Sequence, residues 1–221
     1  MAKQISLFEP VLPTSKATKQ DKKQWLNLPG SSASLALYNA AKIADHCIVV
    51  VTKDTPTAIR LEHEIASLGD ELDIVLFPDW ETLPYDSFSP HQDIISQRLA
   101  TLYKLPSMVK GIVIVPVNTA IGKLAPKQYI QSNSLSVRTG QRSDLHQMRQ
   151  TLESCGYRNV EQVMEHGEFC ARGAILDLYP MGAKHPIRLD FFDDEIDEIR
   201  VFDPENQRSK EKIDTFEILP A

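Results

Sequence analysis

One stretch of the sequence lies where a nucleotide-binding α/β domain would keep its phosphate loop. Residues 30–34 read Gly-Ser-Ser-Ala-Ser and lead into an alanine-rich run that predicts a helix. A Walker A loop also needs a second glycine and a lysine for the β- and γ-phosphates, and both are missing. The pattern therefore indicates a degenerate phosphate loop made of Gly30, Ser31, Ser32, Ala33 and Ser34.

Other catalytic patterns are incomplete in a similar way. His63-Glu64 begins like the zinc-protease motif H-E-x-x-H, but position 67 is a serine. The run 191–195 imitates a Walker B strand, which would ligate Mg²⁺, yet it has no Walker A loop to act with. His166-Gly167-Glu168 echoes the H-x-E of zinc deaminases without the required P-C-x-x-C. We therefore expect no catalytic residue, no metal site and no cofactor.

The loop 79–86 combines carboxylates with aromatic residues. Paired carboxylates could do acid-base work. Because aromatic side chains dominate core burial, we instead expect Trp80 and Tyr85 to anchor this long loop on a sheet.

The best pattern for molecular recognition lies in the strand predicted at 187–192. Arginine and aromatic side chains are the residues most often found as binding hot spots, because they combine a large contact area with directional contacts. Two interpretations stay open. Arg188 and Phe192 form an exposed recognition face, or Phe192 lies under a loop and Arg188 only pairs with Asp190. Strand alternation puts one set on each face: Ile187, Leu189 and Phe191 against Arg188, Asp190 and Phe192.

Neighbouring residues predict a β-meander around this strand. Asp193-Asp194 supplies a turn into a second strand that ends at Asp203-Pro204. Upstream, 169–179 predicts one strand, whose strict alternation would place Arg172 on the apolar side. Gly173 offers a bulge that re-aims side chains, so we expect Arg172 to emerge near Arg188.

The rest of the chain predicts an α/β domain followed by an α+β domain. Strand, helix, strand in succession implies parallel βαβ units, and we expect about four parallel strands. Ser89 is the predicted N-cap of a helix with Pro90 at its first position. The expected divisions are a flexible lead-in at 1–24, the α/β domain at 25–127, the α+β domain at 128–210 and a segment at 211–221 that returns to the first domain. The expected elements outside the meander are strands at 47–51, 74–77, 111–116 and 135–137, and helices from about 30, at 57–68, from 89, at 118–124 and at 143–155.

Composition favours a soluble protein that binds another protein. The chain has 221 residues, of which 42% are hydrophobic and 24% charged, with a net charge of −6. An acidic balance disfavours a dedicated DNA-binding module, which would present a basic stripe to phosphates. Three separated cysteines without a C-x-x-C pair are typical of core residues in a reducing compartment. Without a signal peptide or a long apolar run, we expect a cytoplasmic protein.

The meander motifs resemble a known family. The residues Gly167-Glu168-Phe169, Arg172-Gly173, Leu176-Asp177-Leu178 and Pro180, the run 188–195, and Phe202-Asp203-Pro204 are similar to the UvrA-binding domain shared by bacterial UvrB helicases and the transcription-repair coupling factors, Mfd. The stretch 79–106, followed by Val-Pro-Val-Asn-Thr at 115–119, is closer to the coupling factors. The resemblance covers about 55–221, and its motifs are specific.

This resemblance implies a function. The α/β domain would be a degenerate helicase-like domain lacking a phosphate loop, and 128–210 would be an inserted UvrA-binding domain. Arg172, Arg188 and Phe192 fall on the positions that contact UvrA, where the arginines would pair with carboxylates. The chain would be a monomeric, non-catalytic amino-terminal fragment that recruits UvrA to stalled RNA polymerase during transcription-coupled nucleotide excision repair. The parts of an ATP-dependent translocase that contact RNA polymerase and double-stranded DNA would lie outside these residues, and a distant domain would mask the UvrA-binding face.

Two alternatives remain at this level. The α/β domain could belong to a nucleotide-hydrolysing helicase, which tight ATP binding would reveal. A direct DNA-binding clamp is disfavoured by the acidic balance and by the lack of an aromatic-rich hairpin between Trp80 and Pro106.

Overall fold

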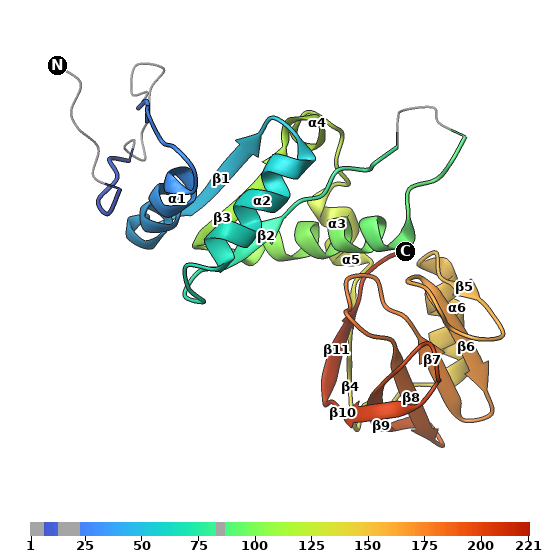
Figure 1. The fold of residues 1–221 in the computed structure, drawn as a ribbon. Helices are drawn as coiled ribbons and strands as arrows, with labels where there is room; N and C mark the ends of the chain where they lie inside the picture. The colour runs from blue at the N-terminus through green and yellow to red at the C-terminus, as the bar shows by residue number, and fades with distance from the viewer. Residues whose placement is uncertain (1–6, 13–22, 83–86) are drawn as a thin grey trace. The chain divides into compact units, whose positions relative to one another are not determined.

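A computed structural model of the chain describes residues 7–12, 23–82 and 87–221 (Figure 1). The backbone divides into two compact units. The first comprises Met1–Asp79 with Pro106–Gly122, and the second Trp80–Leu105 with Lys123–Ala221. The lead-in predicted at 1–24 lies largely outside the described residues, as does Tyr85. None of the helices in the described ranges has the length and apolar composition of a membrane-spanning segment.

The first unit is built on a parallel sheet with the strand order β1-β3-β2. The central strand β3 is buried along its whole length, as expected for an apolar run covered on both faces. The parallel α/β class is confirmed, but among the described residues of the first unit this sheet has three parallel strands, rather than the expected number of about four. The elements are α1 (Ser32–Ile43), β1 (Cys47–Thr52), α2 (Thr55–Ala66), β2 (Ile74–Leu76), β3 (Gly111–Pro116) and α4 (Val117–Ala120).

Helix α2 shows why these residues fold as they do. The Asp54 side chain caps the helix by accepting a hydrogen bond from the Thr57 backbone N–H at 2.8 Å. The helix therefore starts two residues earlier than predicted. Ala58, Leu61 and Ile65 form its buried face, as predicted, and pack in the same core as α1 and β3. Leu68, predicted on the same face, lies beyond the end of the helix and is exposed.

The second unit is dominated by a mixed sheet with the strand order β10-β9-β8-β7-β6-β5 (Figure 1). One face of this sheet is the unit's core, which includes Phe169, Leu176, Leu189 and Ile199. Helix α6 packs Met148 and Leu152 into the same core, as predicted. The elements are α3 (Gln92–Lys104), the 3₁₀ turn η1 (Leu105–Ser107), α5 (Lys127–Ser132), β4 (Leu135–Arg138), α6 (Leu145–Ser154), β5 (Arg158–Asn159), β6 (Glu168–Arg172), β7 (Ile175–Leu178), β8 (Ile187–Phe192), β9 (Glu195–Phe202), β10 (Ser209–Lys212) and β11 (Thr215–Ile218).

Helix α3 groups with the second unit, although its sequence position suggested the first. Ile95 and Leu99 pack against the second unit's core, and the Ser96 hydroxyl accepts the Gly182 backbone N–H at 2.8 Å. The helix begins at Gln92 with His91 as its N-cap, so the predicted Ser89 cap is wrong. Its placement depends on these distant contacts, which local patterning does not reveal.

The single strand predicted at 169–179 is instead a hairpin of β6 and β7. Gly173 has φ +59°, a left-handed conformation that glycine adopts at no steric cost, and it lies in the turn. The two strands pair with Arg172 opposite Ile175. The predicted bulge is therefore a turn between two strands. Side chains alternate between the two faces of the sheet separately in β6 and in β7.

The end of the chain forms a strand, but not one that returns to the first unit. β11 pairs with β4 in antiparallel register, with Phe216 opposite Val137. Met181 and Leu219 form a further bridge to the second unit. The segment 211–221 therefore completes the second unit, because its hydrogen-bond partners lie there.

The Tyr157 hydroxyl links the end of the chain to the rest of the second unit, and removing this hydroxyl has a testable effect on stability. Its buried hydroxyl donates to the Leu219 carbonyl at 2.7 Å and accepts the Met181 N–H at 3.0 Å. Burial raises the pKa of Tyr157 far above its usual value, so the hydroxyl stays protonated. Tyr157→Phe leaves a buried acceptor and donor without partners, and we expect it to lower the free energy of unfolding by about 2 kcal/mol. Urea denaturation measures this loss; a loss below about 0.5 kcal/mol would contradict the assigned role.

Candidate protein-binding face

The face of the six-stranded sheet opposite its core carries the predicted recognition residues. Along β8 the residues alternate between buried and more exposed, which confirms the predicted assignment of side chains to the two faces. Strand pairing aligns β6, β7, β8 and β9, so that Arg172 lies opposite Ile175, and Ile175 opposite Asp190. We call this surface the charged face, and it comprises Arg172, Ile175, Asp177, Arg188, Asp190, Phe192, Glu198 and Arg200.

Register places the predicted site residues on one small area. Asp190 lies between Arg188 and Phe192 on β8, and Arg172 is two strands away from it. With strand spacing near 4.8 Å and a rise near 3.3 Å per residue, the area measures roughly 10 Å by 13 Å. The structure thus brings Arg172, Arg188 and Phe192 onto the same face.

Arg188 is held by a carboxylate of its own unit. Its Nε and one terminal nitrogen donate to the two carboxylate oxygens of Asp177 at 2.6 and 2.8 Å, a bidentate pair. The Asp177 hydrogen bonds raise the pKa of Arg188, and its guanidinium carbon lies 5.0 Å from the Phe202 ring centroid. Asp177 is only 4% exposed. One edge of the guanidinium is therefore committed within the fold, and the other terminal nitrogen has longer contacts, at 3.4 Å, to Gln207 and Ser209.

The alternative in which Arg188 only pairs with Asp190 is wrong, because the carboxylate that pairs with Arg188 is Asp177. Asp190 pairs with Arg200, which also lies 3.2 Å from Glu198. Asp177 was missed because alternation within β8 points to Asp190, whereas the cross-strand register places Asp177 directly opposite Arg188. The polar residue between Leu176 and Leu178 was the available signal.

Arg172 is exposed and lies at the edge of the loop between β5 and β6. Its Nε is 3.2 Å from the Cys170 sulfur, and a terminal nitrogen donates to the Glu161 carbonyl. All three cysteines are free, but only Cys170 is fully buried; Cys47 and Cys155 are partly exposed, so the predicted core position is confirmed for one of the three. The contacts hold the Arg172 side chain across the sheet surface, where a partner can reach it.

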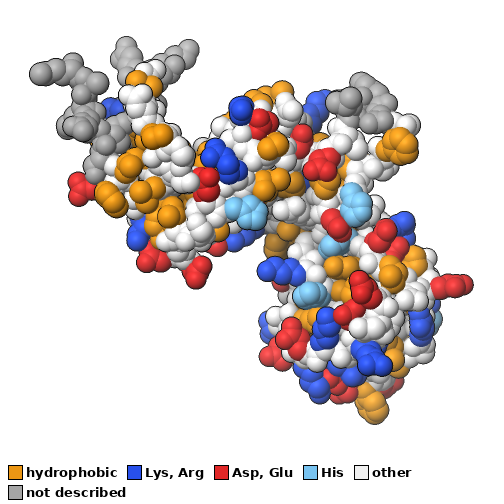
Figure 2. Space-filling view, in the orientation of Figure 1, with side chains coloured by type: hydrophobic (Ala, Val, Ile, Leu, Met, Phe, Trp, Pro, Cys, Tyr) orange, Lys and Arg blue, Asp and Glu red, His pale blue; other side chains and the backbone are white. Residues whose placement is uncertain are grey.

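Phe192 is 77% exposed, so the interpretation that buries it under a loop is wrong. It ends β8 immediately before the Asp193-Asp194 turn, which the structure contains as predicted. Ile175, on the same face, is 37% exposed and was not singled out in the sequence. On the visible side of the molecule, Figure 2 shows acidic and basic side chains interspersed over the second unit, with apolar side chains between them.

Residues 30–34, which the sequence suggested as a degenerate phosphate loop, lie at the start of α1, and one of their side chains is hydrogen-bonded to a carboxylate of the same unit. Gly30 has φ +57°, and Ser31 occupies the N-cap position without a side-chain capping bond. Ser34, which is 1% exposed, donates its hydroxyl to the Glu64 carboxylate, and Arg60 contacts the same carboxylate at 3.1 Å. A carboxylate next to this helix start opposes a phosphate there, since like charges repel.

The Glu64 contact predicts a specific pH dependence. Hydrogen bonding from Ser34 holds the pKa of Glu64 below its usual range. The carboxylate therefore stabilises the fold above its unfolded pKa of about 4.3, and this contribution is lost as pH falls through the lowered folded pKa. We expect Glu64→Gln to lower the thermal midpoint at neutral pH and to flatten its decline in acid. Circular dichroism melts between about pH 3 and 7 measure this, with exposed Asp70→Asn as the control; equal acid slopes in wild type and Glu64→Gln would contradict it.

The remaining motif candidates have structural partners. His166 lies 2.8 Å from an Asp93 carboxylate oxygen and 2.9 Å from the Ala183 carbonyl. Glu168 accepts the backbone N–H groups of Met164 and Glu165 at 2.9 Å each. These bonds fix loops of the second unit.

The structure describes only some of the carboxylates in the loop 79–86. Asp79 lies 3.2 Å from the Thr119 hydroxyl, whereas Asp86 lies outside the described residues. Trp80 is 37% exposed and stacks on Arg98, whose guanidinium carbon is 3.9 Å from the ring centroid. Across the described ranges, no three histidine, cysteine or acidic residues gather as a potential metal site.

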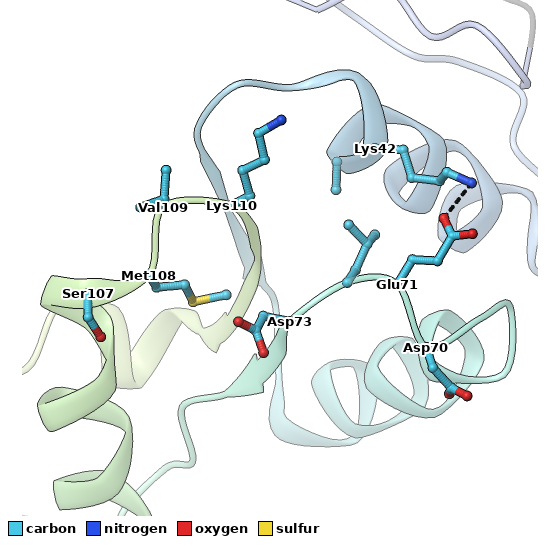
Figure 3. Close-up of a pocket in the computed structure, with 10 residues that line it drawn as sticks. Lys42, Asp70, Glu71, Asp73, Ser107, Met108, Val109 and Lys110 are labelled. Carbon is cyan, nitrogen blue, oxygen red and sulfur yellow. Dashed lines mark ion pairs between the residues drawn. The ribbon is translucent and has the colours of Figure 1, made fainter.

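A hollow of about 510 Å³ in the first unit is a weaker candidate (Figure 3). It lies next to Asp73 and Lys110, at the amino-terminal ends of β2 and β3, whereas parallel α/β sheets bind ligands beyond the carboxyl ends of their strands. Lys42 and Glu71 in its lining pair at 2.7 Å. The hollow therefore has neither the position nor the charge pattern of a nucleotide site.

Comparison with known proteins gives a family match for part of the second unit and similarity to one class of protein over most of the chain. Residues 135–221 match the UvrB interaction domain family. The chain is 49% identical to the transcription-repair-coupling factor of Haemophilus influenzae over 217 residues, which are 98% of this chain and 18% of the relative. It is 48% identical to that of Escherichia coli over 194 residues, 88% of this chain and 17% of the relative. The corresponding protein of Staphylococcus aureus strain MRSA252 is 32% identical over 174 residues, 79% of this chain and 15% of the relative.

The chain thus spans less than a fifth of the length of these relatives. The similarity nevertheless extends over both units of the structure and includes the strands of the charged face. Residues 135–221 therefore match the UvrB interaction domain family, and the chain as a whole is similar, over nearly all of its length, to one segment of the transcription-repair-coupling factors.

Proposed function

We propose that the chain is a non-catalytic adaptor that binds the excision-repair protein UvrA through the charged face. The observation that carries this proposal is the exposed Phe192 ring on a face shared with Arg172 and Arg188, within a UvrB interaction domain. Exposed aromatic and arginine side chains are the usual anchors of protein interfaces. The resemblance to the UvrA-binding domain also implies UvrA contacts at these three positions, which supports the proposal.

The three residues would serve the interface in different ways. Phe192 would be the aromatic anchor, because most of its surface is free to be buried. Arg172, also exposed, would pair with a carboxylate of UvrA. Arg188 would mainly support the face through Asp177 while presenting its second terminal nitrogen to the partner.

The first unit would be a helicase-like domain that has lost its nucleotide site. Two features support this: the missing lysine of the phosphate loop, and the Glu64 carboxylate hydrogen-bonded to Ser34 beside the start of α1. In a longer coupling factor, this module would bring UvrA to stalled RNA polymerase, while other parts of the protein bind the polymerase and translocate on double-stranded DNA with ATP.

Co-elution and competition test the proposal. The chain is expected to co-elute with UvrA in gel filtration, and added UvrB is expected to displace it, because UvrB carries the same kind of domain by resemblance. Separate elution of the chain and UvrA would contradict the proposal. Calorimetry with ATP and Mg²⁺ completes the test; tight ATP binding would support the nucleotide-hydrolysing alternative instead.

A further inference from the structure

The ring of Phe192 is carried on a firmly held hairpin tip, which we define as residues 192–195. Asp193 has φ +57°, as the tight turn between β8 and β9 requires. The segment 140–143 lines the outer edge of β9. Ser143 donates its N–H to the Asp194 carbonyl at 2.8 Å, and Gly140 donates to the Ile196 carbonyl at 2.8 Å. A tip fixed in this way loses little conformational entropy on binding, so its aromatic ring is preorganised as an anchor.

The hairpin tip is acidic, in contrast to the balanced remainder of the charged face. Asp193, Asp194 and Glu195 are all exposed, and among the described residues none of them forms an ion pair. Arg142 lies opposite Glu195 through a backbone bridge, without a side-chain ion pair in the described part of the chain. By comparison, the carboxylates of Asp177, Asp190 and Glu198 each have an arginine partner.

These charges constrain the surface that receives Phe192. Burying the ring brings the neighbouring carboxylates into a poorly hydrated contact, and a neutral apolar surface would leave their lost hydration uncompensated. Lysine or arginine side chains around an apolar pocket would compensate it and speed association. Ile175 lies one strand away from β8 and extends the apolar contact along the charged face.

We infer that the hairpin tip inserts Phe192 into an apolar pocket of the partner that is rimmed by lysine or arginine side chains. The inference rests on the proposed function, in which the partner is UvrA. It divides the interface into two areas of opposite charge: carboxylates of UvrA face Arg172, and basic groups of UvrA face residues 193–195. This division also fixes the orientation of the hairpin on the partner.

A triple variant, Asp193→Asn, Asp194→Asn and Glu195→Gln, tests the inference while keeping Phe192. Asparagine tolerates the left-handed conformation at 193, so the turn is expected to persist. The control is Glu153→Gln, Glu205→Gln and Glu211→Gln, which removes the same charge from exposed positions elsewhere in the second unit. Calorimetric titration with UvrA is run for both variants and for wild type, at about 50 mM and about 500 mM salt, because salt screens surface charges.

The tip variant is expected to bind UvrA at least tenfold more weakly than wild type at low salt, with the difference largely lost at high salt. The control variant is expected to bind within about twofold of wild type, because its charges lie away from the tip. If wild type binds but the tip variant binds equally well or more tightly, the basic rim is refuted and the proposed function stands. If wild type itself fails to bind, the proposed function fails.

Discussion

Phe192→Ala is expected to weaken the binding of UvrA at least 30-fold, which corresponds to about 2 kcal/mol. The side chain is 77% exposed, so its truncation removes contact area from the partner and almost nothing from the fold. The free energy of unfolding should therefore stay within about 0.5 kcal/mol of wild type. Calorimetric titration gives the affinity, and urea denaturation gives the stability.

The chain offers a closely matched control for this change. Phe88 is also 77% exposed and lies outside the charged face. Phe88→Ala removes the same side chain at the same exposure and is expected to leave the affinity for UvrA unchanged. Equal weakening of UvrA binding by both variants would show that the effect comes from general surface hydrophobicity. Unchanged binding by Phe192→Ala would show that Phe192 is not an anchor of the interface.

Arg188→Ala is expected to destabilise the second unit by about 2–3 kcal/mol, in addition to any effect on binding. The substitution leaves the Asp177 carboxylate, which is 4% exposed, without the guanidinium that holds both of its oxygens. An uncompensated buried charge costs more than the lost pair itself. Urea denaturation of the single variants and of the Asp177→Ala, Arg188→Ala double variant measures this coupling.

In that cycle, the double variant should lose less stability than the two single losses combined, since it contains no unpaired buried carboxylate. Arg200→Ala is the control on the same face. Its partners Asp190 and Glu198 have side chains that are 22% exposed, so a loss of about 1 kcal/mol is expected. Additive losses in the cycle would show that the Asp177 pair does not support the face.

The assignment of β8 side chains to the charged face was predictable from local pattern, because the alternation of β8 is regular and its core side is strongly apolar. Arg172 reached this face by a route different from the one predicted. Gly173 makes a turn between two strands instead of a bulge in one, and both solutions move the arginine away from the apolar side. A bulge and a turn at Gly173 both bring Arg172 to the charged face. The sequence therefore predicted the position of Arg172 correctly, although it did not predict the local backbone structure.

Features that depend on distant contacts were not predictable in the same way. The pairing of Arg188 with Asp177 follows from the register between β7 and β8. The joining of β11 to β4 connects segments far apart in the chain. The hydrogen bond near the start of α1 joins Ser34 to Glu64, which comes from α2. Each involves residue types that are unremarkable locally and become informative only once the strands and helices are placed.

The most direct test of the account is the calorimetric titration of UvrA with the wild-type chain. Saturable binding with one chain per UvrA protomer is expected, strongest at low salt and competed by UvrB, because both the arginines and the hairpin tip contribute charge to the contact. Absence of binding under conditions in which circular dichroism shows the chain folded would contradict the adaptor function, and with it the role assigned to the charged face.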